Sequence, residues 1–215
     1  MKKLAGFAFC IFLVSGSVNQ AEAAKSARQA GANGTAPAAQ TVDKTAPSYD
    51  LKGQAALDLA DLQKKFTSLA EAIPAEKYSW RPEAGVRSIN ELFLHVAAAG
   101  FGFPTMMGTV PAPGFDGKGF EKSTTDKAKI IDWLNKSFTY SIAAVNGMSN
   151  SDFAKALPKL GPDANEGDVI YLMVVHAHEH LGQSIAYARA NGVVPPWTAA
   201  AAAEAAKKKQ QAPQD

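Results

Sequence analysis

The sequence predicts an all-α protein whose folded part is a four-helix bundle. Four segments between residues 48 and 197 repeat apolar residues at spacings of three and four, which is the period of an amphipathic helix. Residues that start or stop helices bound these segments. No segment sustains the alternation of apolar and polar residues that is typical of a half-buried β-strand.

The first two helices are predicted from an apolar stripe and an N-terminal cap. The stripe of the first helix consists of Ala55, Leu59, Leu62, Phe66, Leu69 and Ile73. Pro74 then ends this helix. The second helix begins at Ser88, because Glu91 stands three residues later at the spacing of a capping box. It continues through His95 to about residue 107.

The third and fourth helices are expected to have similar lengths. The third spans about residues 126–148, with a stripe formed by Ile130, Leu134, Ser141, Val145 and Met148. The fourth spans about residues 166–190, where Asn191 and Gly192 supply a C-terminal stop ahead of two prolines. Four amphipathic helices of similar length favour a bundle.

The first 23 residues have the layout of a secretory signal peptide. Two lysines precede an apolar run over residues 4–14, and Ala21, Glu22 and Ala23 form a small-x-small cleavage pattern. The run is too short to cross a bilayer, which takes about 20 apolar residues. We therefore expect an exported protein, periplasmic or extracellular, without a membrane anchor after cleavage. Because Cys10 is the only cysteine, the mature chain would have no disulfide and no thiolate ligand.

The rest of the chain divides into a linker, one domain and a tail. Residues 24–47 lack an apolar period and are rich in small and polar residues, which predicts a flexible linker. The domain spans residues 48–197. Residues 198–215 are rich in alanine, lysine and glutamine and predict a solvated tail that is at most partly helical. The formal net charge of +2 gives no reason to expect a nucleic acid as partner.

Three of the four histidines stand close together in the fourth helix, as His176, His178 and His180. At about 100° per residue, His176 and His180 share one face of the helix, and His178 points nearly the opposite way. The shared face continues upstream through Val169 and Leu172, so we expect it to turn toward the core. His178 is expected to face solvent or a partner subunit.

The fourth histidine, His95, lies in a stretch of the second helix that carries no charge between residues 92 and 109. A single such histidine is more often a core residue than a metal ligand. Three imidazoles directed into one core, however, would leave unpaired nitrogens that cost about 1–3 kcal/mol each. A divalent cation bound by His95, His176 and His180 removes that cost and leaves one position open for water or substrate. Zinc is the expected metal, and nickel or iron suit the same ligands.

Four segments also resemble a known family in their order and spacing. They are residues 74–82 (PAEKYSWRP), 88–95 (SINELFLH), 176–183 (HAHEHLGQ) and 191–197 (NGVVPPW). Together they are similar to the DinB/YfiT-like superfamily over nearly all of the predicted domain. The resemblance implies a four-helix bundle, often dimeric, so a homodimer is expected. It also implies a metal triad of one histidine on the second helix and an H-x-x-x-H pair on the last, which here are His95, His176 and His180. The predicted export is less usual, because the best-known members are cytosolic.

Three further residues are candidates for a catalytic role. Gln183 and Tyr187 follow His180 on the same face of the helix, where they could position a water or a substrate, although packing roles fit their positions equally well. Glu179 could orient a ligand or act as a general base, but an ion pair is the commoner role for such a residue.

Three functions remain open at this point. The resemblance implies a metal-dependent enzyme, either a hydrolase or a transferase that adds a low-molecular-weight thiol to an electrophile, as in the bacillithiol and mycothiol enzymes of the superfamily. In both reactions the metal would act as a Lewis acid toward an unidentified small-molecule substrate. The alternatives are a non-catalytic metal-binding or stress-associated module, and a structural protein in which the triad is vestigial. An exported setting that is poor in thiols weakens the thiol-transfer version.

Overall fold

Helix α2 (Leu51–Ala72) opens the part of the chain that the computed structural model describes, residues 50–211. The Asp50 side chain caps it by accepting a hydrogen bond from the Gly53 backbone N–H. All six residues of its predicted apolar stripe are buried. The helix stops before Pro74, as predicted. The predicted signal peptide (1–23) and linker (24–47) lie outside the described residues.

The other three long helices also begin at side-chain caps. Helix α3 (Ile89–Met106) starts with the predicted capping box, in which the Glu91 carboxylate accepts from the Ser88 backbone N–H. Helix α4 (Lys127–Gly147) starts at Asp126, whose side chain accepts from the Lys129 N–H. Helix α5 (Glu166–Ala190) starts at a second capping box formed by Asn165 and Asp168. Within residues 50–211 there is no β-strand, only an isolated bridge in the connection before α5.

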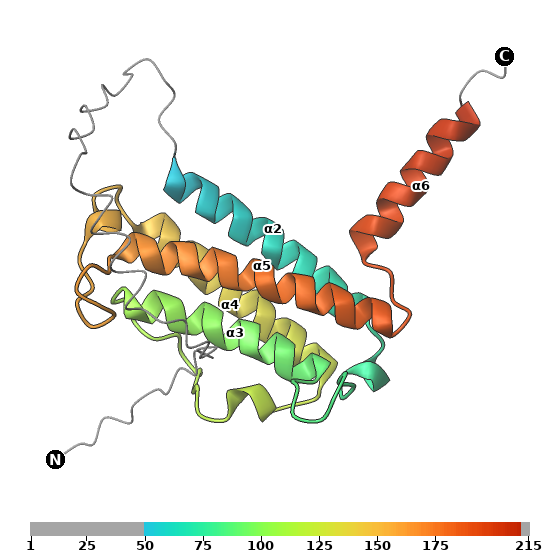
Figure 1. Cartoon of the computed structure of the whole chain (residues 1–215), viewed down its shortest axis with the longest axis horizontal. Helices are drawn as coiled ribbons and strands as arrows, with labels where there is room; N and C mark the ends of the chain where they lie inside the picture. Colours follow the sequence, from blue (N-terminus) through green and yellow to red (C-terminus); the bar gives the residue numbers. More distant parts are fainter. Residues whose placement is uncertain (1–49, 212–215) are drawn as a thin grey trace, which may run out of the picture. The chain divides into compact units, whose positions relative to one another are not determined.

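The four helices pack as a bundle in which neighbours in sequence are not always neighbours in space. Around the bundle the adjacent pairs are α2–α4, α4–α3, α3–α5 and α5–α2 (Figure 1). The sequential pairs α2/α3 and α4/α5 are therefore diagonal, and their connections (residues 73–88 and 148–165) cross the ends of the bundle. This order makes α3 and α5 neighbours, so the two histidine-bearing helices lie side by side.

The bundle core confirms most of the predicted faces and corrects one residue. On α5 the buried positions include Val169, Met173 and Ala177, but Leu172 is 45% exposed. The prediction that Leu172 faces the core is therefore wrong. The reason is angular, because the buried stripe of α5 is centred near Ala177, about 100° from His176, and Leu172 falls on the far side of that histidine. The histidine face thus borders the core instead of pointing to its centre.

Close contact between α3 and α4 depends on Gly100. A Cβ atom at this position would lie 3.1 Å from the Ser137 Cβ and 3.4 Å from the Ser141 Oγ. The Ser141 hydroxyl uses the short approach to donate a 2.7 Å hydrogen bond to the Gly100 carbonyl. A side chain at residue 100 would push α3 away from α4 and disturb the helix that carries His95.

The connection between α2 and α3 is held in place by a buried tyrosine. The Tyr78 hydroxyl donates to the Ala70 carbonyl at 2.7 Å, and the Tyr78 carbonyl accepts from the Asn90 N–H at 2.9 Å. These bonds join the end of α2 to the start of α3. They also bring Trp80 against the ring of Tyr187 on α5, with centroids 5.4 Å apart.

Residues after the bundle form a further helix, α6 (Pro196–Gln211). The predicted boundary between domain and tail, at residue 198, falls inside this helix. Its alanine-rich sequence explains its helicity, since alanine has the highest helix propensity. No residue of α6 is buried. Among the described residues no helix has both the length and the apolar character needed to cross a membrane.

Candidate metal centre

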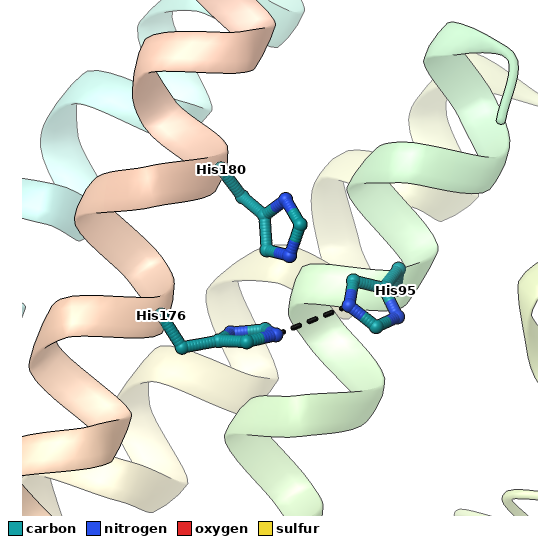
Figure 2. A group of neighbouring side chains, drawn as sticks. All are labelled: His95, His176 and His180. Carbon is teal, nitrogen blue, oxygen red and sulfur yellow. Dashed lines mark hydrogen bonds between the residues drawn. The ribbon is translucent and has the colours of Figure 1, made fainter. Parts of the chain in front are cut away.

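His95, His176 and His180 meet between α3 and α5. Each offers a ring nitrogen, and the three nitrogens lie within 4.8 Å of one another. Figure 2 shows His95 facing the two α5 histidines, which lie one turn apart. The His95 Nε2 and the His176 Nε2 are 3.1 Å apart, and the His180 ring lies edge-on to both neighbours. The structure therefore brings together the three residues that were predicted as metal ligands.

Two of the three rings have their far nitrogen occupied by a hydrogen-bond acceptor. The His95 Nδ1 lies 2.7 Å from the Glu121 Oε1, and a carboxylate can only accept, so Nδ1 carries the proton. The His180 Nδ1 lies 2.9 Å from the Gln183 Oε1, and the Gln183 amide nitrogen donates to the Tyr187 hydroxyl. In the neutral form of both rings the Nε2 atoms are then left as lone-pair acceptors.

Burial keeps the α5 histidines unprotonated at neutral pH. Desolvation, reinforced by the neighbouring His180, His95 and Arg87, lowers the pKa of His176 to about 3. Burial also lowers the pKa of His180, against the opposing effect of its hydrogen bond to Gln183. A neutral imidazole is the form that binds metals, so neither ligand would have to lose a proton first.

The donor set fits a divalent transition metal. Imidazole suits zinc, iron and nickel, and zinc binds it at about 2.0–2.1 Å, which places two ligand nitrogens of a tetrahedral site about 3.3 Å apart. The separation of 3.1 Å between the His95 and His176 Nε2 atoms is close to that value. Without a cation the same distance is that of a hydrogen bond, in which one of the two Nε2 atoms carries the proton.

Sequence reasoning missed two charged residues beside the triad, Glu121 and Arg87. Glu121 lies in the 3-10 turn η2 (Phe120–Lys122), within the long connection between α3 and α4. The Arg87 guanidinium donates to both of its oxygens, at 2.7 and 3.2 Å. Burial raises the pKa of the Glu121 carboxyl, but the hydrogen bonds from His95 and Arg87 outweigh this and hold the pKa at about 2. No periodicity or spacing in the sequence connects residue 121 with residue 95.

The three predicted catalytic residues are placed differently relative to the three histidines. Gln183 contacts the Nδ1 side of His180, while Figure 2 shows the other nitrogen of that ring turned toward His95 and His176. Tyr187 is buried behind Gln183 and contacts it through its hydroxyl. Glu179 is exposed. His178, expected to point away from the triad, is also exposed. Catalytic roles for Gln183, Tyr187 and Glu179 stay predictions.

A small, mostly apolar cavity adjoins His176 on the side of the core. Its volume is about 10 Å³, roughly the room that one water needs. His176, Gly100, Ser137 and Ser141 contribute to its wall. The Ser137 and Ser141 hydroxyls donate to the backbone carbonyls of Leu134 and Gly100. Each hydroxyl oxygen can still accept a hydrogen bond from a water in the cavity.

The sequence matches the profile of the DinB superfamily over residues 58–184. This match includes both histidine-bearing helices up to Ser184. The chain belongs to the DinB superfamily. No protein with a curated description matches the sequence.

Several solved structures share the fold at low sequence identity. A conserved protein from Enterococcus faecalis has a TM-score of 0.55 at 13% identity, over 66% of this chain and 97% of its own. A DinB-like protein from Bacillus cereus has a TM-score of 0.58 at 14% identity, over 67% of this chain and 95% of its own. YfiT from Bacillus subtilis is described as a probable metal-dependent hydrolase with an unusual four-helix bundle topology. It has a TM-score of 0.55 at 15% identity, over 73% of this chain and 97% of its own. At such identities the likeness establishes the fold alone.

Proposed function

We propose that this DinB superfamily protein binds one divalent metal ion through His95, His176 and His180. The metal would activate a water or an external thiol for attack on a small electrophile. The observation that supports the proposal is the convergence of three imidazole nitrogens within 4.8 Å. Three protein ligands leave a coordination position for a reactant, whereas structural zinc sites use four. Zinc is the first candidate, with nickel or iron as alternatives.

The bound metal would act as a Lewis acid that lowers the pKa of a water or a thiol at the open position. The protein contributes neutral ligands and fixed ring orientations, set by Glu121 for His95 and by Gln183 for His180. Tyr187 supports Gln183 by accepting its amide hydrogen. Because the mature chain would contain no cysteine, a sulfur nucleophile has to come from a small-molecule thiol.

A panel of esters, amides and epoxides tests this reaction class. Metal-loaded and metal-stripped protein are compared, with and without a glutathione-type thiol. We expect turnover only in the loaded protein, its loss in His180→Ala, a reduction in Gln183→Ala, and unchanged turnover in the exposed control His178→Ala. Equal turnover by stripped protein, or by His180→Ala, would exclude the metal-dependent reaction.

A non-catalytic metal-binding module is the alternative function. In this alternative the three histidines hold the metal and no reaction follows. Tight metal binding with no turnover on the whole panel would support this alternative.

Export is the second part of the proposal, and the signal-like layout of residues 1–23 supports it. The intact mass of the protein from its native host should correspond to a chain that begins at Ala24. A chain that still begins at Met1, found in the cytosolic fraction, would contradict export.

A further inference from the structure

The Glu121 carboxylate joins three separate parts of the fold at the metal centre. It sits on η2, in the connection between α3 and α4 (residues 107–126). One oxygen accepts from the His95 Nδ1 on α3 at 2.7 Å, and the other accepts from the Arg87 Nε at 2.7 Å. Arg87 stands two residues before α3 begins. None of the three ligand histidines comes from the connection that carries Glu121.

This contact determines which nitrogen of His95 is available to a metal. A carboxylate cannot donate a hydrogen bond, so the imidazole has to present Nδ1–H to it. The lone pair of the neutral ring is then on Nε2, the atom that lies 3.1 Å from the His176 Nε2. A carboxylate behind a ligand histidine also makes the imidazole a better electron donor, and losing such a partner commonly weakens metal binding 10- to 100-fold.

Stabilisation of the fold is a poor explanation for the Glu121–Arg87 pair. The two side chains are 35% and 41% exposed, and ion pairs with that exposure are screened by solvent and contribute little. The connection is anchored independently by Phe120, which is buried and packs edge-on against Trp133 with centroids 5.1 Å apart. Removing the Glu121 charge should therefore leave the connection in place.

The three ligands differ in what supports them, and His95 has the strongest support. His180 is oriented by the neutral amide of Gln183 on its own helix. His176 has no hydrogen-bond acceptor behind its ring among residues 50–211, only the small cavity. His95 alone has a charged partner, and that partner is itself held by two hydrogen bonds from Arg87. Charge-assisted hydrogen bonds are the stronger class.

We infer that Glu121, held in place by Arg87, is a positioning residue that presents the His95 Nε2 to the metal, so that the α3–α4 connection is a functional part of the metal centre. The inference rests on the proposed metal site but not on any catalytic activity. It assigns no ligand role to Glu121, which acts through His95. Arg87 in turn acts through Glu121.

Metal affinity of purified variants, measured by competition with a chromophoric zinc chelator, tests the inference. Glu121→Gln keeps an acceptor but loses the charge, and should bind zinc about 10-fold more weakly. Glu121→Ala loses both and should bind about 100-fold more weakly. The matched control is Glu91→Gln, which breaks a second glutamate–arginine pair, with Arg81 at 3.1 Å, without touching a histidine. It should bind zinc like the wild type.

Arg87→Ala tests the order of action. It should weaken zinc binding less than Glu121→Ala does, because the carboxylate remains. Combining the two substitutions should weaken binding no further than Glu121→Ala alone. Additive losses in the double variant would show that Arg87 acts on the site by a separate route, and would contradict the proposed chain.

The tautomer of His95 in the metal-free protein supplies a readout that a merely structural role would not change. Nitrogen-15 NMR of the ring should show the proton on Nδ1 in the wild type and in Glu91→Gln, and a mixture of tautomers in Glu121→Ala. An unchanged tautomer in Glu121→Ala, or wild-type zinc affinity in both Glu121 variants, would overturn the inference. If the wild type bound no metal at all, the proposed function would fail, while the tautomer would still report on Glu121.

Discussion

Two seams of the bundle, the α2–α4 and the α3–α5 interfaces, contain partly exposed polar side chains that pair in different ways. Between α2 and α4, a hydrogen-bonded group consists of Gln63, Thr67, Asn135 and Thr139, of which Thr139 is exposed. The Gln63 amide donates to Asn135 and Thr139, and the Thr67 hydroxyl donates 3.0 Å to the Asn135 Oδ1. Each of these bonds pairs an N–H or O–H donor with an oxygen acceptor across the two helices.

The α3–α5 seam is built from three imidazole rings, and each ring nitrogen can donate or accept a hydrogen bond according to the tautomer. Its central contact joins two imidazole Nε2 atoms, and the His180 ring lies against both partners. Two of the rings also have an acceptor behind them, Glu121 for His95 and Gln183 for His180. A polar cluster that serves the fold pairs donors with oxygen acceptors across two helices, whereas a cluster suited to a metal directs several imidazole nitrogens toward one point.

Substitutions in the two seams should differ most in their effect on metal occupancy. Alanine at His95, His176 or His180 should each abolish stoichiometric metal, because a three-ligand site loses most of its affinity with any one ligand. His178→Ala, whose side chain is exposed, and Asn135→Ala, in the other seam, should keep full occupancy. Elemental analysis of purified protein measures this. Metal loss in His178→Ala with retention in His176→Ala would refute the assignment of helix faces.

Metal binding should stabilise the folded chain by mass action. With free zinc at 100 times its dissociation constant, the free energy of unfolding should rise by about 2.7 kcal/mol, and a chelator should reverse the gain. Asn135→Ala should show the same gain from its own lower baseline, and His180→Ala should show none. Urea unfolding with and without metal gives both numbers. A gain that persists in His180→Ala would place the metal elsewhere.

Acid should weaken the metal-free protein through the α3–α5 seam. The pKa of His176 is about 3 in the folded chain and about 6.5 when unfolded, so its contribution is complete above pH 6.5 and is lost as the pH falls toward 3. Between pH 7.5 and 5 we expect a loss of about 1–2 kcal/mol, after allowance for partial exposure. His176→Leu should flatten this part of the stability–pH profile. An unchanged slope in that variant would assign the effect to another group.

The smallest expected effect is a difference in unfolding free energy between substitutions in the two seams, measured without metal. Asn135→Ala leaves the Gln63 amide and the Thr67 hydroxyl without their shared acceptor, and should cost about 1 kcal/mol of unfolding free energy. His176→Leu exchanges one hydrogen bond, to the His95 Nε2, for the burial of an apolar side chain, and should cost less than about 0.5 kcal/mol in the metal-free protein. Both values come from urea unfolding in the presence of a chelator. A larger cost for His176→Leu would mean that the triad serves the fold.

The sequence by itself determined the helices and which three histidines come together. Helix boundaries depend on residues within one turn of each other, such as the Ser88–Glu91 capping box and Pro74 after α2, and local chemistry of this kind can be read along the chain. Helical arithmetic was enough to separate His176 and His180 from His178, because the angle between residues on one helix is fixed.

Only the tertiary structure decided which helices adjoin and what supports the ligands. The diagonal placing of α2/α3 and α4/α5 follows from connections that cross the bundle ends, and no local pattern encodes it. That order turns Leu172 toward solvent and His95 toward α5. Glu121 reaches His95 from a turn 26 residues away, in a connection without periodicity. Contacts of this kind depend on how the whole chain packs, because the energy that selects them is shared among residues far apart in the sequence.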